Sequence, residues 1–340
     1  MRSIPILNNT AVVAATFDDA ITIPAIEQWL PPKERPAWLS FWDQKRNELI
    51  VLGIGLLVLS AGLIAQRRLS FTARRLAWFR TGYLLFTLCF VGWYAQAQLT
   101  IVTVIAALQA ALQGEGVAFM LADPMAVVLW AFVLVSLIIW GRGTFCGWLC
   151  PFGAFQELIN SVATRLGLRK RQLHSKVNAM LRGLKYVVLA ALLLAAIVAS
   201  PWLDTMVEIE PFKTTISMGF QRSWPYVAWA VACLALSLLV YRGYCRYLCP
   251  LGAALALLGR VRLFNWIPRR QACGTPCQTC RFRCTYQAIS PVGKVTYSEC
   301  FQCLDCVSIY QDDKRCMPLI KELKRAEKRT IPIQSEAARA

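Results

Sequence analysis

Cysteine is the residue with the greatest chemical potential in this 340-residue chain, which contains fourteen cysteines but a single histidine, His174. One imidazole cannot supply a bis-histidine haem, and it is too few for a His-rich zinc or copper site. Any redox or metal centre built by this chain must therefore use cysteine sulfur for most of its ligands, and no haem is expected. His174 itself lies among basic residues and is expected to be a solvated surface side chain.

Eight cysteines cluster near the C-terminus, where ECFQCLDC gives C-x2-C-x2-C and an earlier segment gives C-x2-C-x3-C. Such closely spaced thiolates are typical of two-cluster bacterial ferredoxins, because a short loop wraps a cubane so that three sulfurs reach three irons. Two [4Fe–4S] clusters are therefore predicted, one held by Cys284, Cys300, Cys303 and Cys306. The other is held by Cys280 and Cys316 with Cys273 or Cys277, and a count of eight ligands fits if both Cys273 and Cys277 bind iron. Zinc ribbons usually show paired C-x2-C knuckles, and a cytoplasmic location disfavours disulfides.

Two details of this segment depart from the usual ferredoxin pattern. Thr285 stands where a proline usually follows the fourth cysteine, and Cys316 lies ten positions beyond Cys306 instead of four. The loop that completes the second set of ligands is therefore expected to be unusual.

A second cysteine motif occurs twice, as R-G-x-C-x3-C-P-x-G-A with one residue skipped in the first copy. A separation of four residues places two thiols on one face of a helical turn. Two such turns could offer four sulfurs to one soft metal or cluster, or form two redox-active dithiols. The alternative is that these cysteines pack as small apolar residues. The four residues are Cys146, Cys150, Cys245 and Cys249, and the last two cysteines, Cys89 and Cys233, are expected to be packing residues.

The elements that position these cysteines are predicted to be membrane-spanning helices. Apolar residues make up 57% of the chain and charged residues only 16%, a composition that cannot keep its apolar surface away from water in a soluble protein. Five stretches are long and apolar enough to cross a bilayer. A sixth run, residues 99–112, is expected to lie at the membrane surface or to re-enter it. The five predicted spans are residues 49–66, 81–98, 124–140, 186–203 and 225–241.

Most of the 37 basic residues fall on one side of these spans, in the loops after spans one and three and in the C-terminal segment. By the positive-inside rule that side is cytoplasmic, so the N-terminus is outside and the cysteine-rich segment inside. The net charge of +18 is then a topology signal that contacts anionic lipid, and no nucleic-acid partner is expected. No cleavable signal peptide is expected, because Asp18 and Asp19 interrupt the first apolar run.

The predicted fold is thus a polytopic α-helical membrane protein of about five transmembrane helices with a cytoplasmic two-cluster ferredoxin-like domain. Residues 1–48 form a periplasmic tail that ends in a proline- and tryptophan-rich linker. Residues 49–270 form the transmembrane domain, residues 271–318 the ferredoxin-like domain and residues 319–340 a basic, flexible tail.

Several ordered motifs resemble the membrane and ferredoxin half of the NosR/NirI family. They include VGWYAQAQLTIV, WGRGTFCGWLCPFGAFQELIN, EIEPFKT, YCRYLCPLGAALAL, CGTPCQTC and ECFQCLDCVSIYQDDKRC. The resemblance implies an inner-membrane protein that supplies electrons for the activity or maturation of periplasmic nitrous-oxide reductase in denitrification. It also implies [4Fe–4S] ligation by the eight C-terminal cysteines. Family members usually begin with a periplasmic FMN-binding domain; none is expected in this chain, so a separate flavoprotein becomes a candidate partner.

Three other functions share these features. A CcoG-like copper reductase or metal-site assembly factor would use the C-x3-C-P thiols for copper, a NapH-like subunit would oxidise quinol, and a redox-sensing regulator would control expression of nitrous-oxide reductase. The chain is expected to be an electron-transfer component and not a self-contained enzyme.

Overall fold

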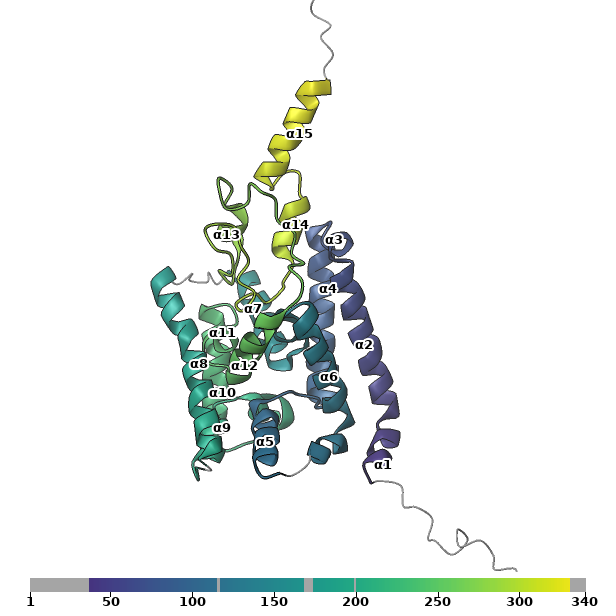
Figure 1. Cartoon of the computed structure of the whole chain (residues 1–340), viewed down its shortest axis with the longest axis vertical. Coiled ribbons are helices and arrows are strands. Elements are labelled where there is room, and N and C mark those ends of the chain that lie inside the picture. Colours follow the sequence, from purple (N-terminus) through teal and green to yellow (C-terminus); the bar gives the residue numbers. More distant parts are fainter. Residues whose placement is uncertain (1–36, 115–116, 168–173, 199, 331–340) are drawn as a thin grey trace, which may run out of the picture.

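The computed structural model describes residues 37–114, 117–167, 174–198 and 200–330, which fold into a helical protein (Figure 1). The N-terminal half contains α1 (Ala37–Gln44), α2 (Arg46–Ile64), α3 (Gln66–Leu69), α4 (Ala73–Phe86), the π-helix η2 (Thr87–Tyr94), α5 (Ile101–Leu112), η3 (Val117–Ala122), α6 (Pro124–Ile139), η4 (Phe145–Leu149) and α7 (Pro151–Arg165). The C-terminal half contains α8 (Ser175–Ile197), α9 (Leu203–Val207), η5 (Lys213–Ser217), α10 (Trp224–Leu239), α11 (Gly243–Tyr247), α12 (Pro250–Leu258), η6 (Gly259–Val261), α13 (Thr279–Arg283), α14 (Asp305–Gln311) and α15 (Met317–Thr330).

Three helical stretches among the described residues are long and apolar enough to cross a membrane, namely Arg46–Ile64, Ala73–Tyr94 and Lys176–Ile197. Two further predicted spans coincide with α6 and α10, which have 16 residues each and fall short of that length. The predicted span 186–203 is displaced, because α8 begins at Ser175 and ends at Ile197. Its first three turns carry Lys176, Arg182 and Lys185, which a search for apolar runs leaves out.

The predicted N-terminal linker and C-terminal tail both contain helix. Helix α1 forms inside the stretch expected to be a linker, and the basic tail expected to be flexible continues as α15 through Thr330. Residues 1–36 and 331–340, which make up the rest of these two tails, lie outside the described residues.

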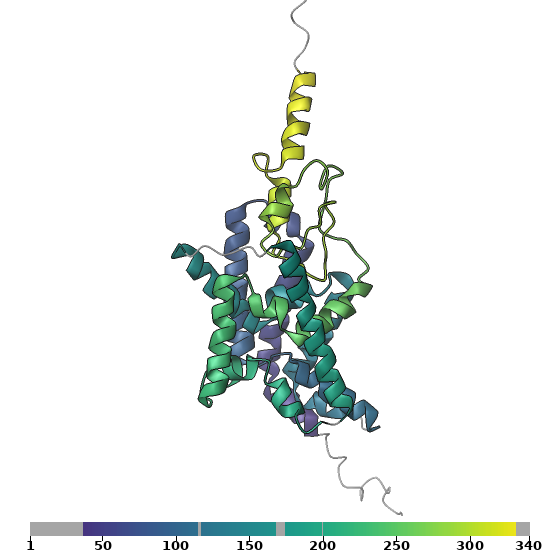
Figure 2. The same cartoon turned by 90° about the vertical axis from the view of Figure 1, so that its left-hand side faces the viewer.

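The longer helices lie side by side along the long axis of the molecule (Figure 1). Helices α1, α5 and α9 lie at one end, and the cysteine-rich segment with α13 and α14 lies at the other. Helix α15 extends beyond that end in both views (Figures 1 and 2). The described N-terminal and C-terminal ends of the chain are therefore at opposite ends of the bundle.

The cysteine-rich segment contains little regular structure of its own. Its position depends on packing against the helices. Two isolated β-bridges occur in it, Cys273 with Cys277 and Ile289 with Val295. The second bridge closes a short turn between the two groups of cysteines. A continuous core joins the segment to the helices, and Phe301 and Trp148 are both fully buried in it.

Three residues to which the sequence analysis gave no chemical role, Cys89, Cys233 and His174, differ in their exposure to solvent. Cys233 is buried, as predicted for a packing residue, whereas Cys89 is exposed on the surface of η2. The packing prediction for Cys89 is therefore wrong, because its side chain faces away from the bundle. His174 is exposed, as predicted for a surface histidine.

Candidate iron–sulfur and thiol sites

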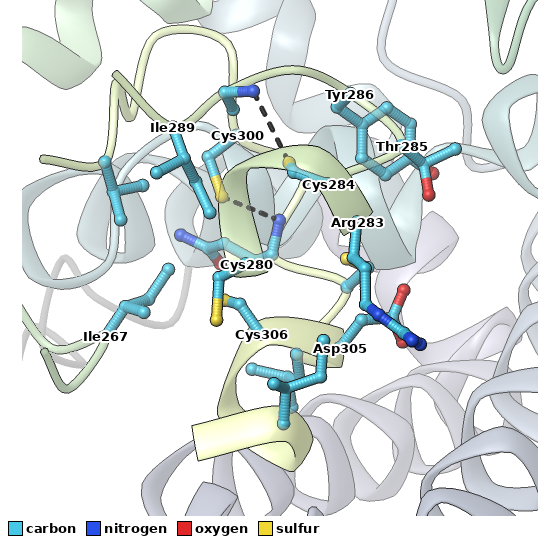
Figure 3. A pocket seen from close by; sticks show the side chains of 16 residues that line it. Ile267, Cys280, Arg283, Cys284, Thr285, Tyr286, Ile289, Cys300, Asp305 and Cys306 are labelled. Atoms are coloured by element: carbon cyan, nitrogen blue, oxygen red, sulfur yellow. Dashed lines mark hydrogen bonds between the residues drawn. The ribbon is translucent and has the colours of Figure 1, made fainter. Parts of the chain in front are cut away.

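The four cysteines predicted to hold one cluster surround a common cavity at the base of the cysteine-rich segment (Figure 3). Cys284 follows α13, Cys300 and Cys303 lie in the loop before α14, and Cys306 is in its first turn. Apolar side chains complete the walls, among them Ile267, Ile289 and Val295. This is the donor set and the water-poor environment that a [4Fe–4S] cluster takes.

The second predicted set lies beside the first. Cys273, Cys277 and Cys280 line a small adjoining cavity, and Cys280 also borders the first one. Cys316 is buried and close enough to Cys280 to affect its titration. The structure therefore brings the eight cysteines together around two adjoining cavities, with Cys280 bordering both.

Arg269 lies between the two groups and was not identified from the sequence. Its guanidinium hydrogen-bonds to the sulfur of Cys280 and lies near Cys306 and Cys273. Burial alone would lower the pKa of Arg269, but the surrounding thiols raise it. A fixed positive charge at this position would offset the negative charge of thiolates on both sides.

Backbone N–H groups point at several of the sulfurs. The N–H groups of Arg270, Ala288 and Gln302 each donate to a sulfur at 3.4 Å, those of Cys273, Cys284 and Cys300 respectively. Gln302 and Leu304 adopt left-handed backbone angles, with φ of 52° and 66°, which curls the loop around its cysteines. Hydrogen bonds to sulfur are one means by which a protein sets the potential of a cluster.

The thiols themselves are held in surroundings that favour the protonated form until metal binds. Burial raises the pKa of Cys300 to about 11, with the Gln302 N–H opposing it, and burial also raises the pKa of Cys303 and Cys306. Metal must therefore displace protons from these sulfurs. Within the described parts of the chain, no three His, Cys, Asp or Glu side chains converge as they do on a single metal ion. Each thiolate ligand of a [4Fe–4S] cluster binds a different iron, so these thiolates lie farther apart than the ligands of a single metal ion.

The two C-x3-C-P motifs form the same local structure. Pro151 and Pro250 each begin a helix, and the preceding Cys150 and Cys249 are the N-caps of α7 and α12. Each capping sulfur accepts a hydrogen bond from a glycine N–H, from Gly153 at 3.4 Å and from Gly252 at 3.2 Å. The sequence C-P-x-G thus places a sulfur at a helix N-terminus, where the peptide dipoles favour a thiolate.

Four buried thiols from the two motifs meet in the interior of the bundle, and we call Cys146, Cys150, Cys245 and Cys249 the thiol tetrad. None of them is more than 7% exposed. Cys150 and Cys245 hydrogen-bond to each other, which lowers the pKa of Cys150 and raises that of Cys245. The sulfurs of Cys146 and Cys249 are near enough to Cys150 to influence their titration as well.

The arginine of each motif binds the other motif. Arg142 donates to the carbonyl of Gly252 at 3.0 Å, and Arg242 donates to the carbonyls of Gly147 at 3.0 Å and of Cys146. Both arginines are almost fully buried. These reciprocal hydrogen bonds hold the two turns together. The only sign of them in the sequence is the R-G dipeptide that both motifs carry before their first cysteine.

The loop that carries the first cluster cysteines packs directly on the first C-x3-C-P turn. A Cβ atom added to Gly147 would lie 2.0 Å from the carbonyl oxygen of Phe301, so the two backbones are in close contact. The indole N–H of Trp148 donates to the carbonyl of Gln302 at 3.1 Å. The Phe301 ring also lies close to two guanidiniums, 5.0 Å from that of Arg142 and 5.4 Å from that of Arg242.

One half-buried carboxylate, Glu157, and one buried carboxylate, Glu299, anchor the surrounding cations. Glu157 pairs with Arg80 and Arg242; burial alone would raise the pKa of Glu157, but the two guanidiniums hold it at about 2. Glu299 binds the ammonium of Lys185 at 2.7 Å and lies within 4 Å of two arginines, Arg142 and Arg182. These pairs fix the helices against the cluster loop, and a buried pair of this kind is costly to break.

Comparison with known proteins finds a matching family model for each of the two cysteine-bearing regions. A family model described as NosR matches residues 271–327, and a model described as a 4Fe-4S binding domain matches residues 122–173 and 223–271. The chain is 45% and 43% identical to the regulatory protein NosR of Pseudomonas aeruginosa and of Stutzerimonas stutzeri, over 86% of its own length. It is 40% identical to the protein NirI of Paracoccus denitrificans over the same share.

The chain belongs to the NosR/NirI family. It spans 41% of the length of the two NosR relatives and 43% of NirI. No solved structure matches it. Within this NosR-type chain, the NosR model covers all eight C-terminal cysteines, whereas the 4Fe-4S binding model covers the thiol tetrad. The comparisons therefore support iron–sulfur clusters in a helical chain that has three candidate membrane spans.

Proposed function

We propose that this chain is a membrane-bound iron–sulfur electron-transfer component of the NosR type, which supplies electrons for the activity or maturation of nitrous-oxide reductase. In this proposal Cys284, Cys300, Cys303 and Cys306 hold one [4Fe–4S] cluster, and Cys273, Cys277, Cys280 and Cys316 hold the other. When bound, each cluster would accept and donate single electrons. The family assignment supports this function, as does the grouping of the eight thiols.

The observation that carries the proposal is the contact between Phe301 and Gly147. Phe301 lies between two predicted cluster ligands, and Gly147 follows the first cysteine of the tetrad. Because electron exchange falls steeply with distance, two redox sites that serve each other must be adjacent. This contact places the cluster loop and the tetrad side by side in a core in which both residues are buried.

The residues around the tetrad have complementary roles. Arg142 and Arg242 hold the two turns together, and with Lys185 they place positive charge near Cys146. Positive charge near sulfur favours thiolate over thiol, which suits either a metal-bound or a redox-active state. We propose that the tetrad is a third redox or metal site, and the 4Fe-4S binding model that covers it supports this role.

For the membrane arrangement we propose five crossings of the inner membrane, with the cysteine-rich segment in the cytoplasm and the N-terminus outside. Helices α6 and α10 would complete the three longer spans, and their apolar composition supports this. The first and last described helices, α1 and α15, lie at opposite ends of the bundle (Figure 1), which supports an odd number of crossings. A fluorescent protein fused to the C-terminus should fluoresce in intact cells; a periplasmic C-terminus would give a dark fusion.

The function is tested by electron paramagnetic resonance of anaerobically purified protein reduced with dithionite. Cys303→Ser should remove the signal of one cluster and Cys280→Ser that of the other, because each lies in a different group. Cys233→Ser, which changes a buried cysteine outside both groups, is the matched control and should retain both signals. If both ligand variants kept both cluster signals, the assignment of the ligands would be refuted.

A metal-handling role is the second candidate, and the hydrogen bond between Cys150 and Cys245 favours it. Two thiolates from opposite turns form a soft donor pair of the kind that suits Cu(I). Copper retention should then be lost in Cys150→Ser and Cys245→Ser, which remove this pair, and in Cys146→Ser and Cys249→Ser, while both [4Fe–4S] signals remain. Unchanged copper handling in these variants would count against this role.

A further inference from the structure

Two hydrogen-bond donors of Arg269 are left unpaired beside the cysteine-rich cavities. Arg269 lines the small cavity that Cys273, Cys277 and Cys280 also border. The Nε and Nη2 atoms of its guanidinium are buried, and neither has a hydrogen-bond partner in the described part of the chain. A buried donor without a partner costs free energy, so two of them at one side chain indicate an acceptor that the polypeptide itself does not supply.

The loop that carries Arg269 is fixed on both sides of this residue. Ile267 is buried in the wall of the first cavity, and its N–H donates to the Tyr297 hydroxyl at 3.2 Å. On the other side, Arg270 pairs with Glu322 at 2.8 Å. The Arg269 guanidinium is therefore held in place by its neighbours along the chain, and its charge has a defined position.

The proposed ligands of the two clusters form a first group and a second group. The first group is Cys284, Cys300, Cys303 and Cys306, and the second is Cys273, Cys277, Cys280 and Cys316.

The positive charge of Arg269 reaches sulfurs of both groups. In the second group its guanidinium hydrogen-bonds to Cys280 and lies near Cys273. In the first group it lowers the pKa of the Cys300 and Cys306 thiols, against the larger effect of burial. Cys280 and Cys306, one from each group, lie close together (Figure 3). One side chain thus stabilises negative charge in both groups.

Two other buried arginines near these sulfurs act on the first group. Arg80 lies near Cys303, and Arg142 lies near Cys300. Both also have structural partners, since Arg80 pairs with a carboxylate and Arg142 binds a backbone carbonyl. Arg269 differs from them because it faces both groups and keeps two donors free of protein partners.

Charge near a [4Fe–4S] cluster affects how readily the cluster is reduced. Reduction adds one electron and makes or breaks no bond, so the cluster with its thiolates gains one negative charge. A nearby positive charge stabilises this reduced form and raises the reduction potential. Hydrogen bonds donated to sulfur act in the same direction.

We propose that Arg269 raises the reduction potentials of both [4Fe–4S] clusters together, through its charge and through the two donors that the polypeptide leaves unpaired. Each cluster is then easier to reduce by the same electron donor. This role deepens the proposed electron-transfer function and rests on it.

The test is a redox titration of the anaerobically purified full chain with dithionite, followed by electron paramagnetic resonance. Arg269→Gln should weaken the electron affinity of both clusters about tenfold, which lowers each midpoint potential by about 59 mV for a one-electron couple. Lys294→Gln is the matched control, because it removes one positive charge from an exposed side chain of the same segment, where water and salt screen it. Both midpoints should then stay at their wild-type values.

Arg269→Lys supplies a second variant, which keeps the charge but loses the planar set of donors. It should lower both midpoints by less than Arg269→Gln does, and it decides the question alone if Arg269→Gln holds no clusters. A shift confined to one cluster, or wild-type midpoints in both variants, would overturn the proposal. Loss of the clusters in Arg269→Lys would also overturn it, since Arg269 would then serve assembly alone.

The wild-type titration separates this role from the function on which it rests. Two reducible clusters with midpoints that do not respond to Arg269 would refute the role of Arg269 alone. Wild-type protein without two reducible clusters would refute the proposed electron-transfer function, and this role with it.

Discussion

The contact between Gly147 and Phe301 makes a sharp prediction for the variant Gly147→Ala. The added Cβ would lie 2.0 Å from the Phe301 carbonyl oxygen, and real Cβ contacts are essentially never below 3.0 Å. The obstructing atom belongs to the backbone, so no side-chain rotation relieves the overlap. The cluster loop must move by about 1 Å or more, and overpacking on this scale costs about 3 kcal/mol.

The expected outcome concerns both stability and the cluster signals. Gly147→Ala should lower the thermal midpoint of the detergent-solubilised protein, and it should shift the resonance spectrum of the cluster held by Cys284, Cys300, Cys303 and Cys306. The shift is expected because the displaced loop carries the Gln302 N–H that donates to the Cys300 sulfur.

A matched substitution isolates this contact from the general effect of alanine. Gly183 lies in α8 with nothing within 4 Å of an added Cβ, so Gly183→Ala should stabilise the helix by about 0.5–1 kcal/mol. A Gly147→Ala protein with the wild-type midpoint and an unaltered cluster spectrum would refute the packing of the cluster loop on the C-x3-C-P turn.

Three further outcomes follow from the buried charges and the cysteine groups. Glu157→Gln should cost about 3–5 kcal/mol in chemical denaturation, because it leaves two buried guanidiniums without their carboxylate. Asp123→Asn, at an exposed helix N-terminus, should cost less than about 0.5 kcal/mol, because asparagine caps a helix about as well as aspartate. Since the folded-state pKa of Glu157 is depressed to about 2, its stabilising effect should be complete above about pH 4.5 and should fade as the pH falls toward 2; a contribution that grows on acidification would contradict this. Reconstitution of the metal-free protein with iron and sulfide should release protons, measurable in weak buffer, because burial raises the pKa of Cys300, Cys303 and Cys306; proton-neutral loading would contradict the buried thiols.

Spacing along the chain was sufficient to predict the groups of cysteines. The spacing of Cys300, Cys303 and Cys306 determines their arrangement locally, because a loop this short can direct its three sulfurs only toward the same cluster. The same holds for the C-x3-C-P motifs, in which proline and glycine at fixed offsets determine a helix N-terminus capped by sulfur. Local patterns of this kind carry over directly into structure.

Long-range pairings could not be predicted in the same way. Arg142 binds a carbonyl 110 positions away, and Trp148 binds one 154 positions away. Nothing in the residues near either side chain specifies its partner, because the partner is chosen by the packing of whole helices.

Helix limits were the other gap, and α8 shows why. Its basic first turns carry Lys185, which is buried against Glu299. A search for apolar runs treats a lysine as a boundary, whereas a buried partner lets the helix continue through it. Electrostatic pairing across the fold thus overrides the local hydropathy signal.

The central claim is that the eight C-terminal cysteines hold two cubanes in a chain that transfers single electrons. The most direct measurement is the iron and acid-labile sulfide content of the anaerobically purified full chain, combined with its dithionite-reduced resonance spectrum. Two [4Fe–4S] clusters predict about eight irons and eight sulfides per chain and two reducible signals. Colourless protein with less than about one iron per chain would contradict the account.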